Sequence, residues 1–254
     1  MLIDSHCHLT YEIDPAGVDA VIARANAAGV GVIICPTADP IDVPAAIKLA
    51  ETHDNIFATI GIHPEHAGAR AADYITDKIL AHPRVVGVGE IGLDYHGEDI
   101  LPRDAQIKLF IEQLEMARRH NLPVAIHTRD AEDDTAAILA DFPEIGGVMH
   151  CFTSGWGLAK NMLDRGFYFS ASGILTFKNA GDIRETFAKI PTDRIVVETD
   201  SPYCAPVPYR GRVCEPAFVT ETARVVAEIK NIPFEKFCDI VVENTKQLYS
   251  KMKI

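Results

Sequence analysis

The feature that most constrains the fold of this chain is an alternation of short apolar runs with longer segments, repeated eight times. The short runs are rich in Val and Ile and have the length of buried strands. Several of the longer segments have helical periodicity, most clearly 104–121, where Phe110 and Leu114 share one face. Two more helices are predicted at 217–229 and 234–250. The expected strands are 2–6, 30–36, 56–63, 84–90, 122–127, 146–151, 167–172 and 194–200.

A strand followed by a helix or an irregular crossover, repeated eight times, predicts an α/β fold of the (β/α)8 TIM-barrel type. At 254 residues the chain has the usual size of such a barrel, so 1–254 is expected to form a single domain. The strand count disfavours an open doubly wound sheet. One long segment rich in Pro and Gly follows the last strand, and such a segment is usually functional.

Composition and charge narrow the class of protein further. No apolar run approaches the roughly 18 residues that cross a membrane, and the N-terminus does not have the pattern of a signal peptide. Six cysteines without CxxC spacing are typical of reduced thiols, so we expect a cytoplasmic protein without a membrane partner. The net charge of −12 argues against broad binding along duplex DNA, but it leaves room for a local cationic pocket.

Polar residues follow most of the predicted strands, at the point where each apolar run ends. The first run, MLIDSHCHLT, places two histidines one residue apart, so in an extended chain both imidazoles project to one face and Cys7 to the other. The carboxyl ends of barrel strands meet at one rim, where these side chains are expected to converge. The residues concerned are His6, His8, His63, Glu90, His127, His150 and Asp200.

A metal centre explains this convergence better than hydrogen bonding in the core does. Unpaired polar groups buried together would be costly, whereas imidazoles and a bridging carboxylate are suitable ligands for two divalent cations. Each residue alone has a simpler interpretation: a histidine at a strand end is often a core residue, and Asp200 could cap a helix. All of these residues except His63 lie at five strand ends, and this coincidence favours the metal. Four other histidines, in helical or loop contexts, are predicted to be solvated: His53, His82, His96 and His120. The role of His66 is left open, with a structural role favoured.

Seven motifs, in order along nearly the whole chain, resemble the TatD family of metal-dependent hydrolases in the amidohydrolase-like superfamily. The motifs are DSHCHL, GIHPE, GEIGLDY, QLEMARRHNLPVAIHTR, HCFTSG, ETDSPY and APVPYRG…EPAF. The resemblance implies a TIM barrel with a two-metal site and a metal-dependent deoxyribonuclease, often a 3′–5′ exonuclease. One position departs from the family pattern, since Cys214 stands before EP where members usually have Asn.

The same resemblance assigns the ligands and the chemistry. One ion would be held by His6, His8, Glu90 and Asp200, and the second by Glu90, His127 and His150, with Glu90 bridging. With two carboxylates among the ligands, two divalent cations would leave the site at about +2, enough to attract a phosphodiester. A bridging water would attack phosphorus, with Asp200 as ligand and proton acceptor, so Asp200 and Glu90 are the expected catalytic residues. The ions expected are Mg, Mn or Zn.

Four residues outside the ligand set are candidates for binding substrate, which we expect to be single-stranded DNA. His63 and Arg129 would hold phosphate, since the planar guanidinium suits a phosphate group. Tyr209 could stack on a base, as could Phe152 and Tyr203, although packing within the loops is the simpler interpretation for all three. Arg210, together with Arg212, could line an entry groove.

Other functions remain open on the sequence alone. A small phosphoester, ester or amide could be hydrolysed at the same centre, although many such barrels place a carboxylated lysine where this chain has Glu90. A non-catalytic barrel that binds metal or nucleic acid is disfavoured by the complete ligand set. RNA is not excluded as a substrate. The sequence does not decide the oligomeric state, for which we expect a monomer.

Overall fold

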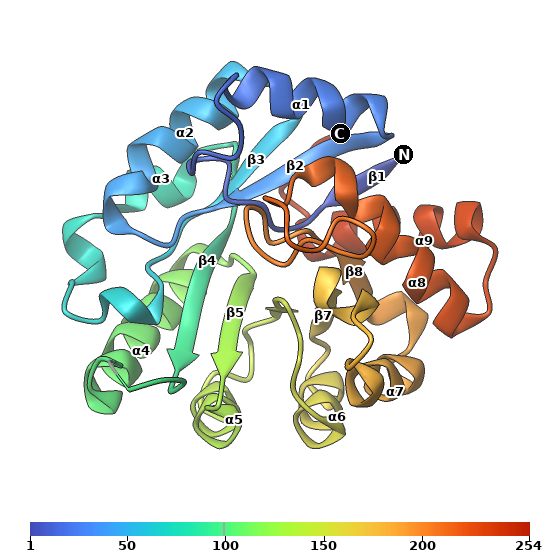
Figure 1. Ribbon diagram of the computed structural model, residues 1–254. Helices are drawn as coiled ribbons and strands as arrows, with labels where there is room; N and C mark the ends of the chain where they lie inside the picture. The colour runs from blue at the N-terminus through green and yellow to red at the C-terminus, as the bar shows by residue number, and fades with distance from the viewer. Residues whose placement is uncertain (99) are drawn as a thin grey trace.

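The computed structural model describes residues 1–98 and 100–254, and within them eight parallel strands pair in chain order, β1 to β8. Nearest neighbours in sequence are therefore nearest neighbours in the sheet (Figure 1). The strands are β1 (Leu2–Asp4), β2 (Val30–Pro36), β3 (Ile56–Thr59), β4 (Val85–Asp94), β5 (Val124–Arg129), β6 (Gly147–Met149), β7 (Tyr168–Ala171) and β8 (Ile195–Val197).

The first and last strands are joined by backbone hydrogen bonds at and beyond their carboxyl ends. The Ser5 N–H donates to Val197 O (3.0 Å), the Asp200 N–H to His6 O (2.9 Å) and the His8 N–H to Ser201 O (2.9 Å). These bonds curl the sheet into a barrel and keep the chain extended where the two histidines lie. The predicted (β/α)8 TIM barrel is confirmed.

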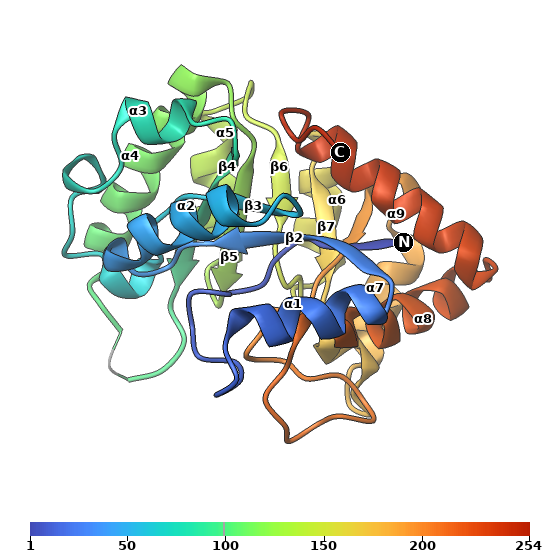
Figure 2. The ribbon, with the colours of Figure 1, turned by 90° about the horizontal axis from the view of Figure 1, so that it is seen from above.

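Helices surround the strands and both chain ends lie close together at one side (Figures 1 and 2). They are α1 (Val18–Ala27), α2 (Val43–Thr52), α3 (Asp77–Ala81), α4 (Arg103–His120), α5 (Glu132–Ala140), α6 (Trp156–Asp164), α7 (Gly181–Lys189), α8 (Val219–Lys230) and α9 (Phe234–Leu248). Short 3-10 turns lie at Pro40–Asp42, Pro64–His66, Ala71–Asp73, Gly173–Thr176, Thr192–Arg194 and Pro216–Phe218. The three predicted helices correspond to α4, α8 and α9, with ends that differ by one or two residues. Among the described residues, no helix combines the length and the apolarity needed to cross a bilayer.

Side chains of alternate strand positions fill two separate cores. One cluster packs the outer face of the sheet against the helices. A smaller cluster takes residues from every strand, such as Phe57 of β3 and Val196 of β8, together with Tyr249 beyond the end of α9. Tyr249 is completely buried. Apolar side chains thus occupy the barrel interior, and the polar groups are left to the rim at the carboxyl ends of the strands.

Most β-strands end at residues other than those predicted, and the strand ends form the rim. β4 and β5 run on together to the pair Asp94 and Arg129, whereas most other strands stop before their polar residue. The reason at β1 is a side chain: Asp4, which is buried, accepts hydrogen bonds from the backbone N–H groups of His6 (3.3 Å) and Thr199 (2.9 Å). The Asp4 carboxyl group therefore accepts hydrogen bonds from backbone N–H groups that would pair with a neighbouring strand if β1 were longer.

Gly92 of β4 has no room for a side chain. Its φ is +142°, and a Cβ atom would lie 2.0 Å from the carbonyl oxygen of His127 on β5. We predict that Gly92→Ala lowers the free energy of unfolding by more than about 2 kcal/mol, because β4 must move away from β5. Urea denaturation measures the change. The control is Gly181→Ala at the start of α7, where a Cβ atom meets nothing within 4 Å. Equal stabilities for the two variants would contradict this packing.

Candidate metal centre

A cavity of about 520 Å³ opens at the carboxyl ends of the strands. Most residues that the sequence predicts for the site line it: His8, His63, Glu90, His127, Arg129, His150 and Asp200. His6 lies beside the others, with only 2% of its surface exposed. The structure therefore brings together all six predicted metal ligands, which come from loops after β1, β6 and β8 and from β4 and β5 themselves.

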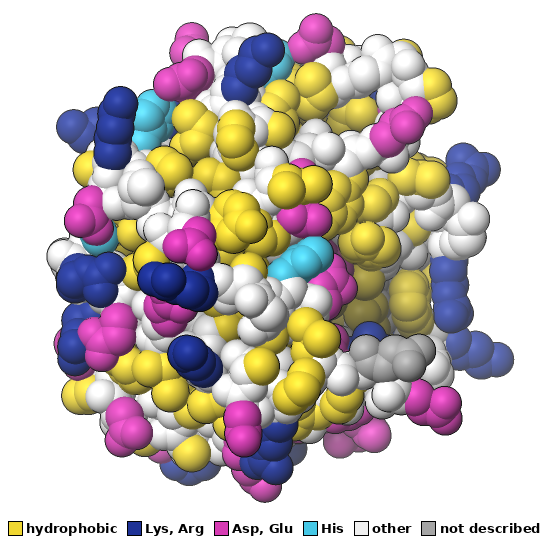
Figure 3. Space-filling view, turned by 90° about the vertical axis from the view of Figure 1, so that its left-hand side faces the viewer, with side chains coloured by type: hydrophobic (Ala, Val, Ile, Leu, Met, Phe, Trp, Pro, Cys, Tyr) yellow, Lys and Arg dark blue, Asp and Glu magenta, His cyan; other side chains and the backbone are white. Residues whose placement is uncertain are grey.

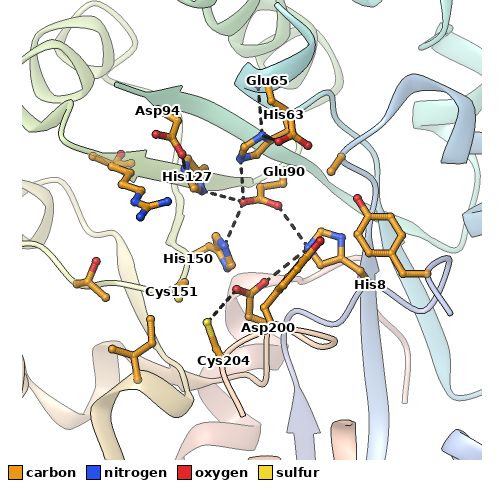
Figure 4. A pocket seen from close by; sticks show the side chains of 17 residues that line it. His8, His63, Glu65, Glu90, Asp94, His127, His150, Cys151, Asp200 and Cys204 are labelled. Atoms are coloured by element: carbon orange, nitrogen blue, oxygen red, sulfur yellow. Dashed lines mark hydrogen bonds and ion pairs between the residues drawn. The ribbon is translucent and has the colours of Figure 1, made fainter. Parts of the chain in front are cut away.

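The Glu90 carboxylate is at the centre of the cluster, and only 4% of the residue is exposed (Figure 4). Its Oε1 atom lies 3.0 Å from His127 Nδ1, 3.1 Å from His150 Nε2 and 3.7 Å from His63 Nε2. Its other oxygen, Oε2, faces the two histidines of the N-terminal motif. One carboxylate therefore has imidazoles on both of its oxygens, which is the geometry of a bridging ligand.

On the Oε2 side the distances are longer than hydrogen bonds. Oε2 of Glu90 lies 3.4 Å from His6 Nε2 and 3.5 Å from His8 Nε2. The same two nitrogens lie 4.0 and 3.6 Å from Asp200 Oδ1. His6 Nε2 is buried and has no hydrogen-bond partner among the described residues. A buried nitrogen left unpaired among carboxylates is costly in itself.

These distances fit ligands of a common ion. Nitrogen and oxygen atoms bound at about 2.1 Å to one ion lie roughly 3–3.5 Å apart, close to the separations seen here. Three overlapping groups hold their potential ligand atoms within 4.8 Å of one another: His6–Glu90–His150, His6–His8–Asp200 and His63–Glu90–His127. The residues present therefore fit a metal, and His63 joins the predicted ligands in this geometry.

Two further carboxylates lie close to the second ring nitrogens of these imidazoles, and sequence reasoning missed both. Asp94 Oδ2 lies 2.9 Å from Nε2 of His127, and Glu198 Oε1 lies 2.9 Å from Nδ1 of His150. Metal-bound histidines commonly contact a carboxylate through the second ring nitrogen. Strand periodicity could have revealed Asp94, since it lies four residues after Glu90 and so shares its face of β4.

The charges of the cluster compensate one another. Burial by itself would raise the pKa of Glu90, but the positive charge of His150 opposes it and the pKa is held well below its usual range. Burial would lower the pKa of His127, but hydrogen bonds to Asp94 and Glu90 raise it to about 9. Protons on the imidazoles thus balance the buried carboxylate. A divalent cation would replace these protons, as is usual when metal binds to histidine.

The predicted substrate residues fall into two groups. His63 and Arg129 line the cavity, as does the exposed Tyr203. Tyr209 and Arg210 do not line it: Tyr209 stacks on Phe218, with ring centroids 3.9 Å apart, and the Arg210 guanidinium lies 4.3 Å from the ring centroid of Phe177. One face of the Tyr209 ring and the Arg210 guanidinium thus contact aromatic residues of the loops after β8 and β7.

Tyr11 is an aromatic residue of the cavity wall that sequence reasoning missed. Its ring stacks on His8 at 5.0 Å and meets Tyr203 edge-on at 6.4 Å. Phe152, by contrast, is buried and packs edge-on against Phe169, so for Phe152 the structure shows core packing. Cys214 is fully buried, with its sulfur 3.9 Å from the Thr199 carbonyl oxygen, and so it packs behind the loop that carries Asp200.

The four histidines predicted to be solvated do not line this cavity, and each lies against a carboxylate. His96 is half exposed, with 52% of its side chain accessible, whereas the other three are between 19% and 24% accessible. Those three are therefore solvated only in part, because a neighbouring carboxylate covers part of each ring. The pairs are His53–Asp19, His82–Glu51, His96–Asp130 and His120–Asp77.

A barrel whose rim gathers histidines and carboxylates around one buried glutamate belongs to the class of metal-dependent barrel hydrolases. Residues 3–250 match the model of the TatD related DNase family. The chain belongs to this family and is a metal-dependent hydrolase.

Individual relatives agree with this assignment. The uncharacterized metal-dependent hydrolase YabD of Bacillus subtilis is 39% identical over 98% of this chain and 99% of its own. YcfH of Escherichia coli, with the same description, is 38% identical over 98% of this chain and 95% of its own. The crystal structure of YjjV, a TatD homologue of Escherichia coli, superposes with a TM-score of 0.85 at 30% identity and covers 98% of each chain.

Asp94 gives a test of the imidazole orientation. We predict that Asp94→Asn weakens metal binding by about 10- to 100-fold, because His127 loses the carboxylate that holds its second nitrogen. Calorimetric titration of metal-stripped protein with Mn²⁺ or Zn²⁺ measures the affinity. The matched control is Asp130→Asn, which removes an exposed carboxylate that contacts only His96 among the described residues. An Asp94→Asn affinity equal to that of the control would contradict the assignment.

Proposed function

We propose that this hydrolase cleaves phosphodiester bonds of DNA, removing nucleotides from the 3′ end of single strands with the help of two divalent cations. The observation that carries the proposal is the position of Glu90, whose two oxygens face two separate groups of ligands. Paired ions bridged in this way are suited to in-line displacement at phosphorus.

The ligand assignment follows the two oxygens. The Oε2 side offers His6, His8 and Asp200, and the Oε1 side offers His127 and His150, with His63 within reach. When bound, such ions polarise a phosphoryl oxygen and lower the pKa of water toward about 7. Histidine and carboxylate ligands without thiolate admit Mg, Mn or Zn in this pair of positions.

Asp200 is proposed as the proton acceptor. Its Oδ1 atom faces His8 at 3.6 Å, Oδ2 accepts a hydrogen bond from the Cys204 thiol (3.5 Å), and Asp200 forms part of the cavity lining. Burial would raise the pKa of Asp200, but the neighbouring imidazoles of His8, His150 and His6 lower it. The carboxylate is therefore ionised at neutral pH. It can take a proton from a water molecule that attacks phosphorus.

The charge around the cavity supports a single strand over a duplex. Arg129 is the one Lys or Arg among the described lining residues, whereas Glu65, Glu90, Asp94 and Asp200 all line the cavity. On the face shown in Figure 3, Lys and Arg are interspersed with Asp and Glu. Phosphate would thus be attracted by the cations and Arg129 and not by a basic surface. A cavity of about 520 Å³ accommodates the end of a strand.

Residues outside the set of metal ligands are proposed to bind the DNA strand. Arg129 would grip the phosphate next to the cleaved bond, and the Tyr11–Tyr203 wall would stack a base. Tyr209 and Arg210 remain predictions for contacts farther along a longer strand. We place the reaction in the cytoplasm, in keeping with six free cysteines, and expect a monomer.

The same small, acid-rich cavity also fits a second substrate class. A small phosphoester, ester or amide could bind the centre without any groove for a polymer, and a cavity of about 520 Å³ has the size of a small-ligand site. RNA would be distinguished only by its 2′-hydroxyl.

The test uses metal-stripped protein with Mg, Mn or Zn added back in turn. Single-stranded DNA and RNA labelled at the 5′ end serve as substrates. We predict products that shorten stepwise from the 3′ end of DNA, only with metal. Asp200→Asn should lower the turnover rate by about 10²- to 10⁴-fold, the usual contribution of a general base.

Asp193→Asn is the control, since Asp193 is an exposed carboxylate remote from the cavity lining. It should cleave like the wild type. If the wild type binds metal but leaves both polymers intact, the small-substrate function is favoured. Near-normal turnover of Asp200→Asn with metal bound would contradict the proposed proton acceptor.

A further inference from the structure

Two cysteines lie on the cavity wall near Asp200, Cys151 next to His150 and Cys204 below Asp200 (Figure 4). Cys151 follows His150 after β6, and Cys204 lies in the long loop after β8. Their sulfur atoms and a carboxylate oxygen of Asp200 all lie within 4.8 Å of one another. None of the other cysteines lines this cavity: Cys7, Cys35, Cys214 and Cys238 are buried elsewhere.

Asp200 therefore has two faces. Oδ1 faces His8 at 3.6 Å, whereas Oδ2 lies 3.5 Å from Cys204 Sγ. In a tetrahedral site with a metal–sulfur distance of about 2.3 Å and a metal–oxygen distance of about 2.1 Å, a sulfur and an oxygen ligand lie about 3.6 Å apart. In the structure the Cys204 thiol donates a hydrogen bond to Oδ2 at 3.5 Å, a separation close to that value.

We propose that Cys151, Cys204 and Oδ2 of Asp200 form a separate site for a thiophilic divalent cation, Zn²⁺ or Cd²⁺. Thiolates prefer such ions to Mg or Mn, so the site differs in chemistry from the Glu90 centre. Each S–H bond breaks as a metal–sulfur bond forms, and both protons pass to solvent. No oxidation or reduction is involved. The fourth position of the tetrahedron opens to the cavity.

The shared aspartate gives this site a consequence for the reaction. An ion held by the two cysteines takes Oδ2, which is the oxygen left to accept a proton in the proposed mechanism. Excess zinc is therefore expected to inhibit the hydrolase. This consequence rests on the proposed function, whereas the binding site itself does not.

The test titrates the metal-stripped full chain with Cd²⁺ in the presence of a phosphine reductant. Cadmium–thiolate bonds give an ultraviolet charge-transfer band that imidazole and carboxylate ligands do not produce. We expect the band to saturate at one thiolate-bound Cd²⁺ per chain. Cys204→Ser should weaken the binding behind the band by about tenfold or more, since loss of a ligand costs at least as much as loss of its support. Cys151→Ser should do the same.

Cys238→Ala is the matched control, because Cys238 is buried in α9, outside the cavity lining. It should give the wild-type band. Absence of the band in the wild type, or an unchanged band in folded Cys204→Ser, would overturn the proposal. Circular dichroism checks that each variant is folded. If Cys151→Ser does not fold, the result for Cys204→Ser decides the test. The charge-transfer band is measured without turnover of any substrate. The test of the cysteine site therefore stays valid even if DNA proves not to be the substrate.

Discussion

The rest of this structure depends on one buried carboxylate, that of Glu90, held among imidazoles from several strands. A charge at this depth is unfavourable unless it is paired, and here His127 and His150 both contact Oε1 at about 3 Å. Such pairing requires strand ends that are far apart in the sequence to meet within a few ångströms. Only a closed sheet with all its carboxyl ends on one rim brings them so close.

The polar groups beneath the rim serve the same purpose. Asp4 is completely buried and accepts from the Thr199 N–H (2.9 Å), with the Thr199 hydroxyl 2.5 Å from its second oxygen. Burial raises the pKa of Asp4 to about 8, so the carboxyl group is neutral at neutral pH and its burial costs less. This contact ties β1 to the loop that carries Asp200. It thereby sets the distance between the N-terminal histidines and the last carboxylate.

Much of this could be read from the sequence, because strand alternation and the polar residues at strand ends are local patterns. Hydrophobic periodicity predicts the eight strands and the face of each strand that packs in the core. The order of the strands in a barrel then predicts that the ligands meet at one rim. The orienting role of Asp94 could not be read so directly, since its contact with His127 exists only once β4 and β5 pair. For Tyr209, the sequence allowed a ring that stacks on a base. In the structure this ring stacks on Phe218, nine residues later, and no local sequence pattern reveals that contact.

Glu90 is proposed to bridge two cations, and anomalous diffraction from crystals soaked in Mn²⁺ would locate them. Two anomalous peaks are expected roughly 3.5–4 Å apart, one near Oε2 with His6, His8 and Asp200, the other near Oε1 with His127 and His150. A single peak, or two peaks that do not contact Glu90, would contradict this proposal.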